Sequence, residues 1–440
     1  MAHVTRWMAR GVMLAALGAM VACGSDNASG SQGPYAKQVA EAIPTIERIT
    51  GLRFKKPPVV QERTKDQVHQ YLQTEFKKQG GQELDQQAIA YKMFGLIPDS
   101  MHLRSFMLAL LTEQVAGYYD PDTQVLYIVK GAPRTMVTFT IQHELVHALQ
   151  DQYMDLDSIL NIHGDDDRQI AAQSVMEGQA TLVPIEAAAG GSVDITKQLP
   201  GVWDRIRQMI RQQNSAMPLM AGAPLFIQES ALFPYLSGAE FIHQFNQRNP
   251  GKQPYGKALP ASTEQVMHPA AYFGATRDAP TYVTLPAPRT GSSLYQNDLG
   301  EFSIRVLIYQ QVQDQSEATR AAAGWDGDRY MVVKTPKGDG VAWLSIWDTQ
   351  VDAAQFQSAM ETVITHLFGG PTARTTADGS RHYQARGRSV LLWGGTVQHR
   401  PAVLYVDMPA GEPTDMIDLK GVRLDSTGVP SDSTRARARS

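Results

Sequence analysis

Cysteine is nearly absent from this chain, because its 440 residues contain only Cys23. A single cysteine excludes an intramolecular disulfide, so no disulfide framework stabilises the fold. It also means that no thiolate in the folded region can bind zinc. Any metal there must be held by histidine, aspartate or glutamate.

The chain also lacks a large excess of charge of one sign and, beyond its N-terminal segment, a long apolar run. The chain has 40 lysine and arginine residues against 44 aspartate and glutamate residues, for a net charge of −4. This small, unpatterned charge gives no reason to expect nucleic acid as a partner. Beyond the N-terminal segment no run of about 18 apolar residues occurs, so we expect no transmembrane helix. There is no internal repeat, and the length leaves room for two or three domains.

Residues 1–22 have the pattern of a signal peptide. Arg6 and Arg10 precede a short apolar region, as in a secretory signal. The residues that follow, Met20 to Ser25, resemble a bacterial lipobox, in which the cysteine is lipidated. An ordinary secretory signal with an incidental cysteine is the alternative. We therefore expect Cys23 to carry a lipid that anchors the protein to a membrane of the bacterial cell envelope, with the Gly/Ser-rich residues 23–34 as a flexible tether.

Residues 143–147 read His143-Glu144-Leu145-Val146-His147, an HExxH motif. The surrounding segment contains no glycine or proline, and its apolar residues recur at helical spacing, which predicts a helix with a buried stripe. On a helix this spacing places both imidazoles one turn apart on the same face. Two such histidines indicate a Zn²⁺ site, with Glu144 beside it to act on the attacking water. The alternative is a polar helix face with two hydrogen-bonded histidines.

A catalytic zinc site of this type needs a third protein ligand, with the fourth position left to water. The best candidate is Glu177, in the middle of a helix predicted over 165–189, where an unpaired glutamate is costly to bury. Gly178 and Ala180 are small, as expected where two helices approach closely. His163, in a Gly/Asp-rich loop, is a rival ligand. A glutamate that faces solvent is the alternative for Glu177.

The stretch HELVHALQD with a downstream glutamate resembles the gluzincin metallopeptidases, the thermolysin-like clan. The resemblance implies that zinc is bound by His143, His147 and Glu177. It implies that Glu144 is the general base and that Asp151 supports the site from outside the ligand set. One position departs from the family, because gluzincins often carry an aspartate four residues after the ligand glutamate, where this chain has Thr181.

The chain is more closely similar to one subgroup, bacterial gluzincin lipoproteins that are peptidase-like and mostly without an assigned function. The stretches that carry this similarity are VAGYYDP at 115–121, FPYLSG at 233–238, residues 260–269 and GWDGDRY at 324–330. Together they span the chain from residue 35 to about residue 350.

Peptide hydrolysis also needs a hydrogen-bond donor for the tetrahedral oxyanion. The candidates are His268, Tyr235, Tyr119 and Tyr118. His268 precedes a proline in a loop-like segment, where packing does not require a histidine. A structural histidine and half-buried, packed tyrosines are the alternatives.

The predicted fold class is α+β. A mostly helical, zincin-like metallopeptidase domain with a small sheet is expected over residues 35–295, a smaller C-terminal α+β region over 296–412, and a polar tail over 413–440. A turn over 117–123 and a strand over 124–129 precede the HExxH helix. In zincin-type peptidases the edge strand of such a sheet runs along the cleft, and a peptide substrate can pair with it.

The remaining elements follow from periodicity and from turn residues. Helices are predicted over 35–51, 64–78, 85–95, 101–115, 201–223, 233–249 and 303–323. Strands are predicted over 57–60, 329–334, 340–347, 389–393 and 396–406.

These features favour a membrane-tethered zinc peptidase that hydrolyses peptide or protein substrates. Two alternatives stay open: a non-catalytic, binding or chaperone-like lipoprotein on the same scaffold, and a zinc amidase that acts on cell-wall peptides. The presence of Glu144 favours an enzyme, because a binding protein has no need of the base. The C-terminal region has no cluster of catalytic residue types and is expected to serve packing or substrate positioning.

Overall fold

The computed structural model describes residues 35–78, 81–131, 134–156, 159, 162–190 and 217–426. The predicted signal peptide, Cys23 and the tether lie outside the described residues, as does most of the helix predicted over 201–223. Within the described ranges, no helix is both long enough and apolar enough to cross a bilayer.

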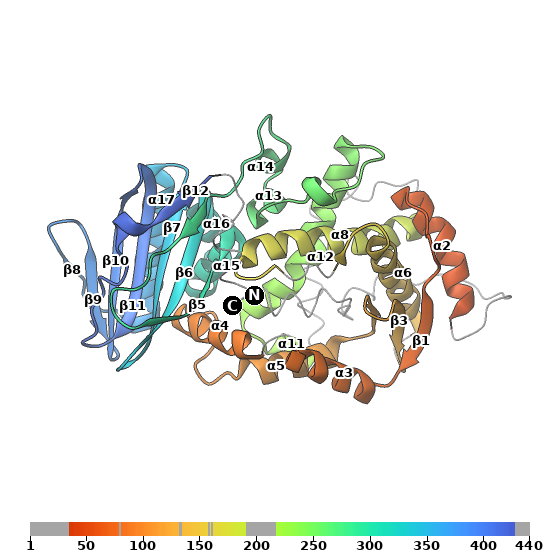
Figure 1. The fold of residues 1–440 in the computed structure, drawn as a ribbon, viewed down its shortest axis with the longest axis horizontal. Helices are drawn as coiled ribbons and strands as arrows, with labels where there is room; N and C mark the ends of the chain where they lie inside the picture. The colour runs from red at the N-terminus through yellow and green to blue at the C-terminus, as the bar shows by residue number, and fades with distance from the viewer. Residues whose placement is uncertain are drawn as a thin grey trace.

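The described chain forms two parts that lie side by side (Figure 1). One part is mostly helical and contains a three-stranded sheet, and the other is built on a seven-stranded antiparallel sheet. This arrangement confirms the predicted α+β class, with a helical first part and a sheet-based second part.

The first part follows the predicted order of elements closely. Its elements are α2 (Ala36–Thr50), β1 (Val59–Arg63), α3 (Lys65–Lys78), α4 (Gly81–Met93), α5 (Leu103–Gln114), β2 (Gly117–Asp120), β3 (Val125–Val129), α6 (Arg134–Asp151), α8 (Asp166–Ala188), α11 (Pro218–Ala221), α12 (Leu225–Arg248), η2 (Gly256–Ala258), α13 (Thr263–Met267) and α14 (Pro269–Phe273). Pro44 and Pro234 lie inside α2 and α12, and neither ends its helix.

The small sheet corrects one prediction. Residues 117–120 were expected in a turn, but they form β2, which pairs antiparallel with β3, while β1 pairs with β3 in parallel. The strand predicted just before the HExxH helix, β3, is therefore central, and β2 is an edge. Tyr118 and Tyr119 favour strand over turn, and both are buried.

Helix α8 begins and ends where the sequence predicts. The side chain of Asp165 accepts a hydrogen bond from the backbone N–H of Arg168, which caps the N-terminus. In its second half α8 packs against α12, with Gly178 facing Gly238. A Cβ atom added to Gly178 would lie 2.2 Å from the carbonyl carbon of Gly238. The predicted close approach of two helices is therefore present, and the partner helix is α12.

The second part is a seven-stranded sheet in the order β5-β6-β7-β11-β10-β9-β8. Its elements are β4 (Tyr282–Thr284), β5 (Ser292–Asn297), α15 (Gly300–Val312), α16 (Gln315–Ala322), β6 (Trp325–Thr335), β7 (Gly338–Trp347), α17 (Gln350–Phe368), β8 (Arg374–Thr375), β9 (Arg381–Ala385), β10 (Arg388–Val397), β11 (Arg400–Pro409), η3 (Leu419–Gly421) and β12 (Arg423–Asp425). The predicted boundary between residues 295 and 296 falls inside β5. The helix predicted over 303–323 is two helices, because Gln313 is left-handed (φ 61°) and Asp314 caps α16.

Alternate residues of the sheet contribute to two separate cores, as the two-residue period of a strand requires. On one face Tyr330 and Trp343 pack with α17 and the helical part. On the other face Met331 and Leu344 pack with a second apolar cluster that includes Val283 from β4. This second face is covered by the β4–β12 pair and the segment leading into β12.

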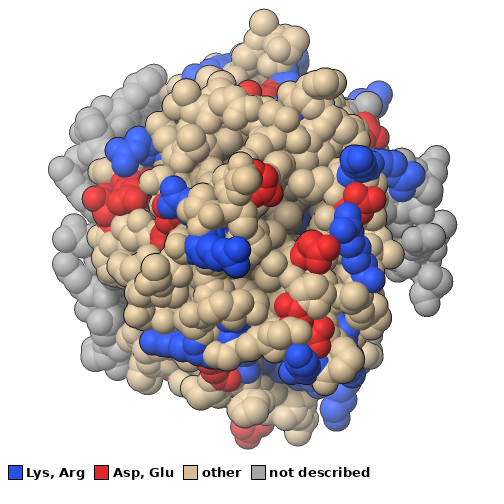
Figure 2. All heavy atoms as spheres, turned by 90° about the vertical axis from the view of Figure 1, so that its left-hand side faces the viewer, with Lys and Arg blue, Asp and Glu red and all other residues tan. Residues whose placement is uncertain are grey.

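The predicted polar tail is folded over part of its length. Met416, Ile417 and Val422 are buried in the second apolar cluster. Residues 416–425 therefore belong to the fold. The outer end of the sheet region is mostly uncharged, with lysine and arginine side chains scattered beside aspartate and glutamate (Figure 2).

Candidate metal centre

Helix α6 places the HExxH motif at the centre of the first part. Ile141, Leu145 and Leu149 are buried in a cluster with α2 and the small sheet. This apolar stripe fixes the rotation of the helix about its axis. His143 and His147 then point toward α8, and both side chains are buried.

Three donor atoms converge between α6 and α8. His143 Nε2 lies 3.1 Å from His147 Nε2 and 3.2 Å from Glu177 Oε2, and His147 Nε2 lies 3.4 Å from the same oxygen. The structure therefore brings together the three residues that the sequence proposes as ligands. The rival ligand His163 is elsewhere, half exposed and 3.5 Å from Glu83.

This group fits a metal ion of the size of zinc. With bonds of about 2.0–2.1 Å and tetrahedral angles, two zinc ligands lie about 3.3 Å apart, which is close to the three distances observed. Two imidazole nitrogens and one carboxylate oxygen are also a donor set that zinc accepts. The buried group His143, His147 and Glu177 could thus hold a metal ion.

The electrostatics of the group favour one shared positive charge. Burial alone would lower the pKa of His147, but the Glu177 carboxylate raises it to about 9. Burial would raise the pKa of Glu177, but His147 and the hydrogen bonds of both histidines lower it to about 2. Burial lowers the pKa of His143. The carboxylate is therefore ionised and its neighbourhood attracts a cation.

Gln150, which the sequence analysis did not single out, orients His147. Its Nε2 donates to the backbone carbonyl of Met176 (3.1 Å) and to Gln179 Oε1 (2.9 Å). Its Oε1 therefore faces His147 Nδ1 at 2.9 Å, and Nδ1 must be the donor because an amide oxygen only accepts. This bond leaves the lone pair of His147 Nε2 to face the other two donors, as a metal ligand requires.

Glu144 is buried beside this group and is held by the edge strand. The backbone N–H of Tyr119 in β2 donates to Glu144 Oε2 over 2.9 Å. Glu144 Oε1 has no hydrogen-bond partner within the described part of the chain. Burial raises the pKa of Glu144 well above its ordinary value, and the negative charge of Glu177 adds to this, while His147 opposes it.

Of the tyrosines considered as oxyanion donors, Tyr235 contacts the metal group, whereas Tyr118 packs within the small sheet. The ring of Tyr235, on α12, stacks on His143 with 5.9 Å between centroids. Burial and the carboxylates of Glu177 and Glu144 raise the pKa of Tyr235, so its hydroxyl keeps its proton. Tyr118 instead packs in the small sheet against the ring of Tyr127.

Tyr119 and Asp151 form a pair of their own. The Tyr119 hydroxyl donates to Asp151 Oδ2 over 2.9 Å. Asp151, the residue expected to support the site from outside the ligand set, thus ties the edge strand β2 to the end of α6. This bond helps to fix the position of the Tyr119 N–H that holds Glu144.

His268 is paired with a glutamate that is not part of the metal group. It sits between α13 and α14, half exposed, with Nε2 2.8 Å from Glu301 on α15. Thr263 at the start of α13 bonds Asp167 at the start of α8. Within the described part of the chain no hydrogen bond or ion pair joins His268 to the metal group, and its role as an oxyanion donor stays a prediction.

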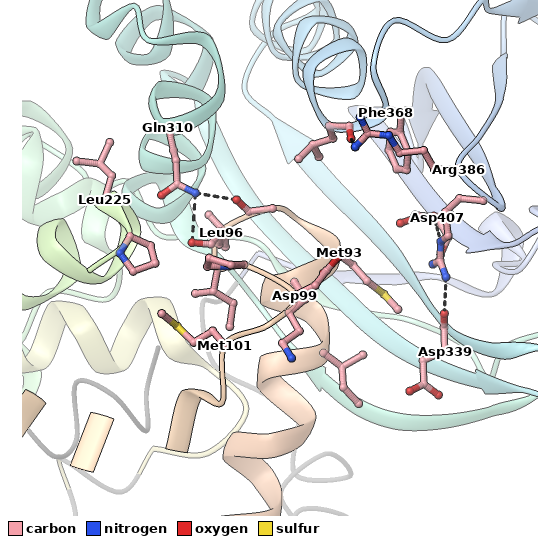
Figure 3. Close-up of a pocket in the computed structure, with 18 of the residues that line it drawn as sticks. Met93, Leu96, Asp99, Met101, Leu225, Gln310, Asp339, Phe368, Arg386 and Asp407 are labelled. Atoms are coloured by element: carbon pink, nitrogen blue, oxygen red, sulfur yellow. Dashed lines mark hydrogen bonds and ion pairs between the residues drawn. The ribbon is translucent and has the colours of Figure 1, made fainter. Parts of the chain in front are cut away.

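The structure also has a pocket of about 970 Å³, between α4, α12 and the sheet (Figure 3). It contains none of the metal-group residues. Two of its polar side chains are engaged, since Gln310 donates to the carbonyl of Gly95 and Arg388 pairs with Asp407. Lys92 and Asp99 also line it, but among the described residues it contains no group of converging metal-ligand side chains like that of the metal centre.

Comparison with known proteins finds one family model that matches part of the chain. Residues 289–401, within the sheet-based part, match the model of a domain of unknown function, DUF8575. A comparison with curated proteins finds no match. Among solved structures, the chain is similar to a protein from Chloroflexus aurantiacus described as "a putative hydrolase with a novel fold", at 17% identity and a TM-score of 0.32, over 60% of this chain and 96% of that one. At this TM-score the likeness carries no argument about fold or function.

Proposed function

We propose that this protein is a zinc-dependent peptidase. His143, His147 and Glu177 hold the metal, and Glu144 is the general base. The observation that carries the proposal is the convergence of three donor atoms at 3.1–3.4 Å beside a buried glutamate. A structural zinc site would have four protein ligands, whereas three ligands and an adjacent base are the arrangement of hydrolytic sites.

Each residue of the site has its own role in the proposed hydrolysis. A bound zinc ion supplies a Lewis acid that makes water nucleophilic near neutral pH. Glu144 accepts the proton of the attacking water through Oε1 and returns it to the leaving amine. The N–H of Tyr119 holds Oε2, so the carboxylate keeps its orientation while the proton moves. Tyr235, protonated and next to His143, would donate to the developing oxyanion.

A peptide is the substrate class that the edge strand favours. In an antiparallel pair, alternate residues direct their N–H and C=O away from the partner strand. The N–H of Tyr119 bonds Glu144, so this residue faces away from β3. The outer edge of β2 thus runs beside the proposed base, and an extended peptide that pairs with this edge would bring its backbone carbonyls to the site.

The test uses the soluble chain from Gly24, loaded with one equivalent of zinc, and a diverse peptide library read by mass spectrometry. Glu144→Gln should keep zinc and lose cleavage, because the metal ligands stay and the base is removed. Glu41→Gln, an exposed change on α2, is the matched control and should cleave like the wild type.

Two results would contradict the proposal. Cleavage that survives in Glu144→Gln would remove this residue as the base. A folded, zinc-loaded protein that cuts no peptide would favour the narrower alternatives, a zinc amidase for cell-wall peptides or a binding protein. Incubation with purified cell-wall peptides then separates those two.

We also propose that a lipid on Cys23 tethers the protein to a bacterial envelope membrane. The lipobox-like pattern Met20 to Ser25 supports this, followed by a Gly/Ser-rich tether. Cys23→Ser should move the protein from the membrane fraction to the soluble fraction. Retention of the variant in the membrane fraction would count against the anchor.

A further inference from the structure

Three carboxylates meet where the helical part joins the sheet. Glu264 is on α13, Asp278 lies in the loop after α14, and Asp348 directly follows β7. One oxygen from each lies within 4.8 Å of the other two. The group shares no residue with the metal centre described above, and it joins segments that are far apart in the sequence.

Glu264 is the unusual member of this group. It is only 6% exposed, yet its carboxyl makes no hydrogen bond or ion pair with any described residue. An ionised carboxylate without a partner is costly to bury. Burial, together with the negative charges of Glu301 and Asp278, raises the pKa of Glu264 to about 10. One oxygen of this largely buried side chain, which has no hydrogen-bond or ion-pair partner among the described residues, thus lies within 4.8 Å of an oxygen of Asp278 and of Asp348.

The nearby cationic side chains are already engaged. Arg400 is paired with Asp326. Arg277, next to Asp278 in the sequence, donates to the carbonyl of Lys257 and to the Tyr272 hydroxyl. Burial and the negative charges of Asp278 and Asp326 raise the pKa of Asp348 to about 6. Arg400 opposes this rise in the pKa of Asp348, but among the described residues no arginine forms an ion pair with any of the three carboxylates.

We propose that Glu264, Asp278 and Asp348 bind a calcium ion that ties α13 to the end of β7. The ligands are all carboxylate oxygens, which calcium prefers and zinc does not require. With Ca–O distances of about 2.3–2.6 Å, two oxygen ligands of one ion lie at most about 5 Å apart, and the three oxygens here all lie within 4.8 Å of one another. Asp278 and Asp348 are exposed, so water can complete the six to eight oxygen ligands that calcium takes.

The ion would act at the joint between the two parts. Helix α13 also touches the start of α8 through Thr263 and Asp167, and α8 carries the metal ligand Glu177 further along. Calcium would thus stabilise the joint between the two parts without contacting His143, His147 or Glu177. This inference does not depend on peptidase activity, and its test reads calcium binding and thermal stability.

The experiment titrates calcium chloride into the zinc-loaded protein by calorimetry and follows the melting temperature in parallel. We expect one equivalent of calcium to bind and the melting temperature to rise by several degrees. Asp278→Asn and Asp348→Asn change exposed residues that tolerate substitution, and each should weaken calcium binding at least tenfold. Asp415→Asn, an exposed carboxylate in the segment before β12, is the matched control and should bind like the wild type.

Glu264→Gln distinguishes a calcium ligand from a carboxyl that only stabilises the fold. Without calcium this variant should melt higher than the wild type, because it removes the unpartnered carboxyl. It should also lose the response to calcium. The proposal is overturned if the wild type shows no saturable calcium binding, or if both aspartate variants bind calcium as tightly as the control.

Discussion

Gly178 is the position where packing and metal binding can be tested together. A Cβ atom there would lie 2.2 Å from the carbonyl carbon and 2.4 Å from the oxygen of Gly238, whereas ordinary contacts begin near 3.4 Å. Gly178→Ala must therefore push α8 and α12 apart by roughly 1 Å. Overpacking of this kind costs about 3 kcal/mol. The better helix propensity of alanine returns about 1 kcal/mol. We expect a net loss of about 2 kcal/mol in the free energy of unfolding.

The same displacement of α8 should also weaken metal binding. Glu177 is the residue before Gly178, and ligand distances tolerate only about 0.2 Å. Zinc affinity should fall at least tenfold. Urea unfolding of the metal-free protein measures the first effect, and competition with a chromophoric chelator measures the second. Gly222→Ala at the end of α11 is the control, because its added Cβ meets only one carbonyl oxygen at 3.3 Å. A Gly178→Ala protein as stable as the wild type would refute the reasoning.

Three further predictions concern the site and its surroundings. Gln150→Met should weaken zinc binding by about 10–100-fold by removing the partner of His147, while Gln142→Met on the same helix should leave the competition assay unchanged. Zinc removal should lower the free energy of unfolding by about 4 kcal/mol relative to protein with free zinc 1,000-fold above its Kd, and Glu177→Ala should abolish this difference in calorimetric melts. The hydrogen bond to Glu301 raises the pKa of His268, so its stabilisation should be complete below about pH 6.5 and disappear as the pH rises through the higher folded-state value. His268 is 43% exposed but Glu301 only 2%, so His268→Ala takes a partner from a buried carboxylate and should cost about 1–3 kcal/mol at pH 5.5. Urea unfolding should show a smaller loss at pH 9, and a loss that is equal at both pH values would show that the ion pair is not the cause.

The convergence of His143, His147 and Glu177 was predictable because its signals are local. An HExxH on an uninterrupted amphipathic segment defines a helix face, and a glutamate among apolar residues, as at Glu177, needs a partner. The role of Gln150 was not predictable in the same way. Its amide is oriented by Met176 and Gln179 on α8, and the contact depends on how two helices pack, which no local pattern specifies.

Other differences involve signals that the sequence contains. Asp314 caps α16 by accepting from the N–H groups of Ser316 and Glu317, and such a cap predicts a new helix start within the segment 303–323. Thr349 and Asp352 form a capping box that begins α17, a helix that periodicity alone did not indicate. The location of His268 beside Glu301 is different, since it depends on the path of a loop between distant segments.

The second face of the large sheet has a consequence for how the protein is made. Three residues that cover this face, Met416, Ile417 and Val422, follow all seven strands in the sequence and are therefore synthesised after them. During synthesis the strands therefore emerge with an apolar face still open to water. Exposed apolar surface of this kind promotes association with other chains. The nascent sheet is vulnerable until the final segment reaches it, so a premature stop before residue 416 would leave a sheet that is complete in hydrogen bonding but prone to aggregate.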